Sequence, residues 1–445
     1  MKVRKWGKTV SLRALAIWAA LLCNYFVVYA SSLSSVLIPK YGVILLFQIA
    51  GIVLILIAEG SLGKIKLDAG DFFCLWVMFL VAVGYRINNA SFTRAANYFL
   101  MLTFLLVAKR SQRWEDRFVK LMAAAGVFYT VTTLLMRLDS ELYYRTVPAL
   151  YPSERRFDWW YQSGFMTGIT DHNTTNGCVL SIAVIFLFGF WISAKPKSGA
   201  KKGYALLTVL ALFCLILTKK RGNLLFSVMG ILLACYFRDK GKKRRFLKYA
   251  CILAAALISL SLGYRFIPSL RKVLERFQDM NSDENIAIRL AMWQAALKSI
   301  VKNPLLGIGW FGYSRKIAAL VGGRSGEAHC VYLQLTCETG IFGMLIFSLW
   351  FGYSLFCAVS LLKDVGGKAK NYSTAMKRWI FISTAFQIFI LLYAMTENPL
   401  YDYYINPVYY AMSIPTVQIY GKTLRKEKWE RKHADELAAI SRECS

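Results

Sequence analysis

The stretch LILTKKRGNLLF, residues 215–226, places three consecutive cations, Lys219, Lys220 and Arg221, between two apolar runs. Runs of this kind cross a membrane as helices, because a helix satisfies its own backbone hydrogen bonds in lipid. If both runs cross, the turn between them has room for little besides the three cations. The stretch therefore predicts a helical membrane protein with a cationic turn at one surface, and it raises the question of which anion the turn meets.

The rest of the chain repeats this alternation of apolar runs and charged connectors. Of its 445 residues, 57% are hydrophobic, whereas soluble domains carry roughly 45–50% apolar residues. We therefore expect a single all-α polytopic membrane domain over residues 1–445, with about twelve transmembrane helices. The predicted spans are residues 14–31, 41–59, 72–86, 95–108, 118–136, 178–194, 204–218, 223–237, 249–264, 340–362, 380–396 and 407–421.

The formal net charge of +30 does not indicate nucleic-acid binding, because most cations form short clusters between apolar runs. Twelve spans put both termini on the same side, and the connectors on that side carry most of the Lys and Arg. Positive connectors mark the cytoplasmic face, so both termini are predicted inside. The basic tail, residues 422–445, is predicted to be a cytoplasmic amphipathic helix near anionic lipid.

Two long connectors fall on the opposite, outer face: residues 137–177 and 265–329. Long connectors of this kind are usually functional or disordered, and their Trp, Tyr and Arg content favours ordered structure at the outer interface. The Lys219–Arg221 turn also falls on the outer face, where the positive-inside rule does not explain it. It is either a fixed anion site or a set of side chains that reach lipid phosphates.

The segment EAHCVYLQLTCETGIFG, residues 327–343, carries a second candidate site. In a continuous helix, His329, Gly340 and Gly343 fall on one stripe. The glycines would let another helix or a lipid chain approach closely, and the histidine above them would act as a base. The alternative is an interfacial histidine that caps a tightly packed helix. Glu338, in the same helix, would either orient a neighbour or be a buried partner.

The segment 283–316 begins with a predicted amphipathic helix on the outer surface. Its apolar residues, from Ile286 to Val301, recur at helical spacing and fall on one face. Ser282 and Asp283 are candidate caps, and Asn303-Pro304 ends the helix. Arg289 borders the apolar face, where it either reaches lipid phosphates or enters a site. In GFMTGITDHNTTNG, residues 164–177, His172 and Asn173 either bind a sugar or belong to a polar loop tip.

Familiar cofactor and metal motifs are missing from the sequence. The ten cysteines include no CxxC or Cys/His zinc spacing, and no HExxH, GxSxG, Walker or Rossmann pattern is present. We therefore expect no metal and no cofactor. Outer-face cations with a histidine suit glycosyl transfer from a lipid-carrier diphosphate. Cations neutralise the leaving diphosphate, and the base takes the acceptor's proton.

These residues resemble the O-antigen ligase and O-antigen polymerase family of bacterial envelope proteins. The family's Arg-x-x-x-Leu motif matches Arg221–Leu225, and its His followed by Gly-x-x-Gly matches His329 with Gly340 and Gly343. Asn303–Gly309, NPLLGIG, resembles the stretch that precedes the family's histidine. Cys330 departs from the Asn, Ser or Gln that often follows this histidine.

The resemblance implies a GT-C-like helical glycosyltransferase of the bacterial cytoplasmic membrane, with a large outer loop over the site. It implies a metal-independent reaction at the outer face, with an undecaprenyl-diphosphate-linked glycan as donor. Arg221 would hold the diphosphate, Arg289 would be a second contact, and His329 would act as base or position the acceptor. Lys219 and Lys220 join this set on charge and position alone. Chain-length regulators and flippases are the protein partners that such a role implies.

Two questions of function stay open at this stage. A polymerase passes the glycan to another lipid-linked repeat, and a ligase passes it to a lipid-A core, a protein or a cell-wall glycan; the resemblance favours a polymerase of O-antigen, capsule or exopolysaccharide. A polysaccharide transporter or flippase is the alternative class. It predicts ionisable residues at mid-membrane in symmetric halves, and the predicted spans contain few of them.

Overall fold

The computed structural model describes most of the chain. The described residues are 2–5, 8–25, 41–59, 67–111, 114–147, 161–170, 172–239, 247, 251, 284–317, 326–366, 372–402 and 405–443.

Helices dominate the described residues, as predicted. The helices are α1 Leu12–Asn24, α3 Tyr41–Glu59, α4 Ala69–Asn88, α5 Phe92–Ala108, α6 Trp114–Leu138, α7 Ser140–Thr146, α9 Asn173–Ser193, α10 Gly199–Leu217, α11 Arg221–Arg238, α14 Glu284–Lys302, a π-helical turn Tyr313–Ile317, α15 Val331–Gly366, α16 Thr374–Tyr393 and α17 Asn406–Glu443. An antiparallel hairpin of β1 Lys2–Lys5 and β2 Lys8–Ser11 precedes α1. The all-α prediction did not include this hairpin.

Eleven of the twelve predicted spans coincide with a described helix, and residues 249–264 lie almost entirely outside the described residues. Six of these helices, α4, α6, α9, α10, α15 and α16, are long and apolar enough to cross a membrane. Three shorter apolar helices are α1, α5 and residues 43–59 of α3. The chain is therefore a multi-pass membrane protein, whereas the count of twelve and the GT-C-like arrangement stay predictions.

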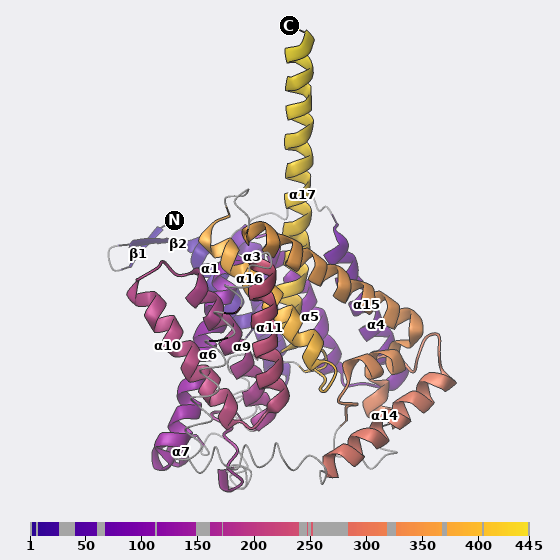
Figure 1. Cartoon of the computed structure of the whole chain (residues 1–445). Coiled ribbons are helices and arrows are strands. Elements are labelled where there is room, and N and C mark those ends of the chain that lie inside the picture. The colour runs from indigo at the N-terminus through magenta and orange to yellow at the C-terminus, as the bar shows by residue number, and fades with distance from the viewer. Residues whose placement is uncertain are drawn as a thin grey trace.

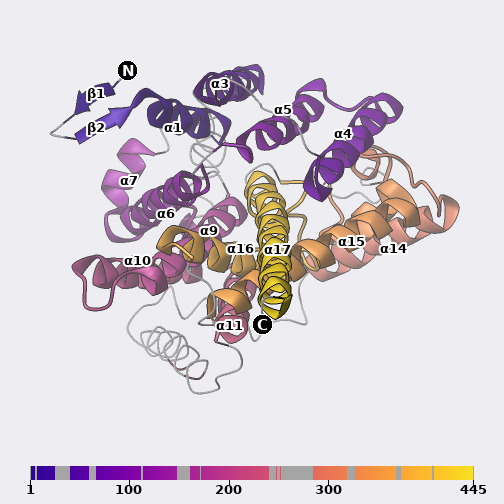
Figure 2. The same ribbon diagram turned by 90° about the horizontal axis from the view of Figure 1, so that it is seen from above.

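The helices form a bundle with two distinct ends (Figure 1). The α7 and α14 helices lie at one end, and the N-terminal hairpin and the projecting part of α17 lie at the other. Seen from above, α9, α16 and α17 occupy the middle of the bundle, with α1, α3, α4, α10 and α15 around them (Figure 2). In α9, 89% of the most apolar 18-residue stretch is buried, as expected for a helix that is apolar on all sides.

The basic tail is helical, as predicted, and its place near anionic lipid stays a prediction. It continues α17 beyond Pro415 without a break and leaves the bundle along the axis of that helix (Figure 1). An amphipathic helix that binds a lipid surface lies in the plane of that surface. The predicted tail helix is therefore present, as an extension of the last predicted span.

The α15 helix is kinked at Gly340, and this kink corrects one prediction. Gly340 has φ 68° and ψ −175°, so the continuous helix predicted over residues 327–343 does not form. The Ile341 N–H donates to the Pro304 carbonyl at 2.8 Å, and the Gly309 N–H donates to the Glu338 carbonyl at 2.8 Å. The close approach predicted at Gly340 is therefore made by the chain's own 304–309 segment, not by a lipid chain or another helix.

Replacing Gly340 with alanine is expected to destabilise the protein strongly. A Cβ atom there would lie 2.1 Å from the Leu305 carbonyl oxygen, and a positive φ alone costs a non-glycine residue roughly 1–3 kcal/mol. We expect a clear drop in the thermal unfolding midpoint in detergent. Gly352→Ala is the matched control in the same helix, since no atom lies within 4 Å of its added Cβ. Equal midpoints for the two variants would contradict the packing at the kink.

Candidate active site

His329 lies just before α15 rather than inside it. Its φ is 51°, so the backbone turns there, and the helix begins at Val331. The imidazole Nδ1 lies 2.7 Å from Oε2 of Glu397, in the loop that follows α16. The Val331 N–H donates to the Ala394 carbonyl at 2.9 Å, which ties the two segments together. The histidine is therefore held by a carboxylate 68 residues away in the sequence.

Arg289 reaches the same carboxylate from α14. Its Nη2 lies 2.8 Å from Oε1 of Glu397, and its Nη1 donates to the Thr396 carbonyl at 2.8 Å. The α14 helix is held in place by Trp293, whose indole N–H donates to the Ala328 carbonyl at 2.9 Å. This helix matches the predicted one and ends before Asn303-Pro304, although Ser282 and Asp283 lie outside the described residues. Arg289 and His329 thus share Glu397.

The first turn of α11 approaches the same loop. A Cβ atom at Gly222 would lie 3.6 Å from Oγ1 of Thr396, so the turn packs beside the residue next to Glu397. Lys220 is the N-cap of α11, and its own side chain makes no capping hydrogen bond. The positive end of a helix dipole favours a nearby anion. Arg221 is the first residue of this helix, so the motif predicted from the sequence lies close to the histidine.

Glu397 is charged at neutral pH. Burial alone would raise the pKa of its carboxyl, but the hydrogen bond from His329 and the charges of His329, Arg289 and Lys220 outweigh burial and lower that pKa to about 2. An ionised carboxylate only accepts hydrogen bonds, so Nδ1 of His329 carries a proton and donates it. In the neutral imidazole, Nε2 then has a free lone pair for a proton. The hydrogen bond to Glu397 thus orients His329 so that Nε2 can accept a proton.

Changing Glu397 to glutamine tests this linkage. Since the pKa of Glu397 lies below its ordinary value of 4.5, the carboxylate stabilises the fold at pH above 4.5, and that contribution is lost as the pH falls toward 2. The shift corresponds to roughly 3 kcal/mol at pH 7. We expect a lower unfolding midpoint for Glu397→Gln at pH 7, with the wild-type advantage shrinking below pH 4.5. If the midpoints of wild type and Glu397→Gln differed by the same amount at pH 7 and at pH 3, the carboxylate would not stabilise the fold in this way.

The other predicted residues lie around this centre with local contacts. The Lys219 ammonium donates to the Ser163 carbonyl at 2.8 Å and lies 4.7 Å from the centre of the Phe165 ring. His172 is the N-cap of α9 and accepts the Thr174 N–H at 3.1 Å through Nδ1. The buried Asn173 amide donates to the Thr218 carbonyl at 3.3 Å. The Asn173 bond holds the start of the turn against α9, and the Lys219 bond ties the turn to Ser163.

Glu338 is buried and hydrogen-bonded to neighbouring segments, which is one of the two alternatives that the sequence left open. Its Oε1 accepts the Tyr313 N–H at 3.0 Å, and its Oε2 accepts the Tyr401 hydroxyl at 2.9 Å. It thereby joins α15 to the turn before it and to the loop before α17. Gly343 lies one turn beyond the kink, where an added Cβ would contact Thr339 of the same helix.

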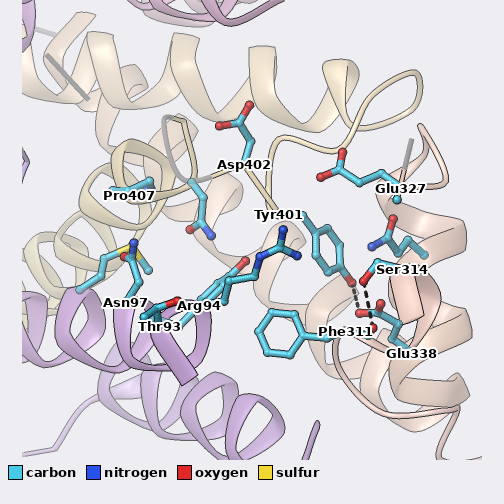
Figure 3. A pocket seen from close by; sticks show the side chains of 15 residues that line it. Thr93, Arg94, Asn97, Phe311, Ser314, Glu327, Glu338, Tyr401, Asp402 and Pro407 are labelled. Carbon is cyan, nitrogen blue, oxygen red and sulfur yellow. Dashed lines mark hydrogen bonds between the residues drawn. The ribbon is translucent and has the colours of Figure 1, made fainter. Parts of the chain in front are cut away.

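A cavity of about 310 Å³ lies next to the segment that leads to His329. Its walls come from α5, from the segment that precedes α15, and from the loop between α16 and α17 (Figure 3). Glu327, two residues before His329, lines this cavity. Burial raises the pKa of the Glu327 carboxyl to about 7, and the charge of Asp402 adds to the rise, while that of His329 lowers it. The site thus combines a charged Glu397 with a Glu327 that titrates near neutral pH.

Sequence reasoning missed Glu397 and Asp402. Both lie in the short connector after the eleventh predicted span, on the same predicted side as His329. A carboxylate in so short an outer loop is the signal that was available. Within the described part of the chain, no three His, Cys, Asp or Glu side chains are grouped so that they could hold a metal ion.

Comparison with known proteins finds a family model that matches part of the chain. Residues 206–348 match the family model described as O-antigen ligase. The matched region begins in α10 and ends in α15, so it contains Arg221, Arg289 and His329. Glu397 lies beyond it. No curated protein matches the chain.

Proposed function

We propose that this chain, which the matched domain assigns to the O-antigen ligase and polymerase family, polymerises undecaprenyl-diphosphate-linked repeat units at the outer face of the bacterial cytoplasmic membrane. The family implies a glycosyl-transfer enzyme that acts on lipid-linked glycans in the inner membrane. The observation that carries the proposal is the convergence of Arg289 and His329 on Glu397, beside the first turn of α11.

The donor's diphosphate is assigned to the cationic side of this centre. As the bond between the anomeric carbon and the diphosphate oxygen breaks, the electron pair stays on the diphosphate, and its negative charge grows. Arg221, Arg289 and Lys220, with the positive end of α11, stabilise that charge. Guanidinium groups bind phosphate oxygens in pairs. Because the cations neutralise the leaving group, the reaction needs no metal; Lys219 contributes at longer range.

His329 is assigned as the base. The acceptor hydroxyl oxygen bonds to the donor's anomeric carbon, and the hydroxyl proton passes to Nε2 of His329. Glu397 holds the ring and stabilises the imidazolium that forms, as the carboxylate does in a catalytic triad. Glu397 is a positioning residue, since it acts through His329 and Arg289.

Incubation of purified protein with lipid-linked repeat units alone tests this proposal. A polymerase extends the glycan and releases one undecaprenyl diphosphate per bond formed. No extension, followed by transfer once a lipid-A core or another non-carrier acceptor is added, would favour the ligase alternative that the family description names. If no glycan is transferred under either condition, the glycosyltransferase assignment is wrong and the transporter alternative is favoured.

A further inference from the structure

The cavity that Glu327 lines has side chains suited to a sugar ring. At about 310 Å³ it lies at the small end of ligand pockets, which occupy roughly 300–1,000 Å³. Asn97, Gln334 and Asn406 bring amide groups to it, and Phe311 and Tyr401 bring aromatic rings. Amides both donate and accept hydrogen bonds, as hydroxyl groups require, and aromatic faces pack against apolar C–H surfaces.

One buried amide in this wall has an acceptor atom without a partner. Asn406 is 3% exposed, and its amide nitrogen donates to the Leu400 carbonyl at 2.8 Å. Its Oδ1 accepts no hydrogen bond from any described residue. A buried polar atom without a hydrogen-bond partner destabilises the fold by about 1–3 kcal/mol. A ligand that donates a hydrogen bond to this oxygen would remove that cost. A sugar hydroxyl supplies such a hydrogen bond.

The charges of the cavity differ from those around Glu397. Arg94 extends from α5 into the cavity, which Glu327 and Asp402 also line (Figure 3). With Glu338, three carboxylates and one cation line the cavity, so it is not a positive site and does not favour a diphosphate. Lys220 and Arg289 act on Glu397 instead. The centre therefore has a cationic side and a hydroxyl-binding side, with the 327–329 segment between them.

We propose that this cavity binds the acceptor's terminal sugar as an uncharged ring, with the attacking hydroxyl held by Glu327 beside His329. This inference rests on the proposed function. The hydroxyl donates to the Glu327 carboxyl while it waits and passes its proton to His329 as its oxygen bonds to the anomeric carbon. The leaving diphosphate takes the electron pair on the other side. Arg94, Asn97 and Asn406 select the sugar.

Direct binding tests the site independently of catalysis. The probe is a fluorescently labelled single repeat, released from the host's envelope polysaccharide and free of lipid and phosphate. Ser314 lines the cavity and is half-buried, so Ser314→Phe fills part of it. We expect this variant to bind the probe at least 10-fold more weakly than wild type, while binding of undecaprenyl diphosphate stays unchanged.

Matched variants make the outcome decisive. Ser140→Phe in α7 adds the same ring to a half-buried serine away from the cavity, and it keeps wild-type binding. Asn97→Ala removes an amide from the wall without adding volume, and weakens binding even if Ser314→Phe fails to fold. Equal probe binding by wild type, Ser314→Phe and Asn97→Ala, or no probe binding by wild type, overturns the inference. Probe binding without any glycan transfer by wild type would instead overturn the proposed function, because the binding measurement does not require catalysis.

Discussion

Replacing His329 with alanine is expected to reduce glycan transfer by a factor of roughly 10²–10⁴, the range that a positioned general base contributes. Glu397 holds the imidazole at 2.7 Å, and in the proposed mechanism the substitution removes the base that takes the acceptor's proton. The measurement is the rate of chain extension by purified protein with lipid-linked repeats.

The other two histidines supply the controls for this variant. His433 is exposed on the projecting part of α17, and His433→Ala is expected to keep the wild-type rate. His172→Ala removes an N-cap from α9, so it lowers stability by about 1 kcal/mol with a small effect on the rate. A His329→Ala rate within a factor of two of wild type would contradict the assignment of the base.

Replacing Arg289 with alanine is expected to reduce transfer by a factor of roughly 10²–10³, as the loss of one preorganised donor to a developing negative charge does. The loss has two causes. The proposed contact to the diphosphate disappears, and Glu397 loses one of the two side chains that hydrogen-bond to it, so His329 is held less firmly. Binding of undecaprenyl diphosphate is expected to weaken as well, which His329→Ala does not cause.

Two variants on the same helix distinguish charge from geometry. Arg289→Lys keeps the charge but not the paired N–H groups that reach Glu397 and Thr396, so it restores only part of the rate. Lys298→Ala removes an exposed cation from α14 and is expected to have no effect. If Lys298→Ala slowed transfer as much as Arg289→Ala, the general charge of α14 would matter instead of the Glu397 contact.

Sequence periodicity predicted the elements better than it predicted their junctions. The α14 helix and its end before Asn303-Pro304 followed from an apolar stripe and a helix-breaking pair. The kink at Gly340 did not, because a glycine in an apolar run is equally compatible with an unbroken helix. Only the docking of the 304–309 segment determines that the helix bends there.

The site could be predicted in part for a similar reason. Arg221 and Arg289 carry charge at positions that the positive-inside rule or an apolar face does not explain, and His329 precedes Gly340 and Gly343 at a recognisable spacing, so the sequence marks all three. For Glu397 the only signal is a carboxylate in a short connector, because its partners come from α14 and from the segment before α15. Contacts between residues far apart in the chain depend on helix packing, which hydropathy does not encode.

Single-turnover chain extension by the Glu397→Gln, His329→Ala and combined variants tests the central claim most directly. If Glu397 acts through His329, the combined variant transfers at about the rate of His329→Ala alone, because groups that act as a unit are not additive. All variants keep their binding of undecaprenyl diphosphate above that of Arg289→Ala. A combined loss equal to the product of the two single losses would contradict a shared His329–Glu397 base.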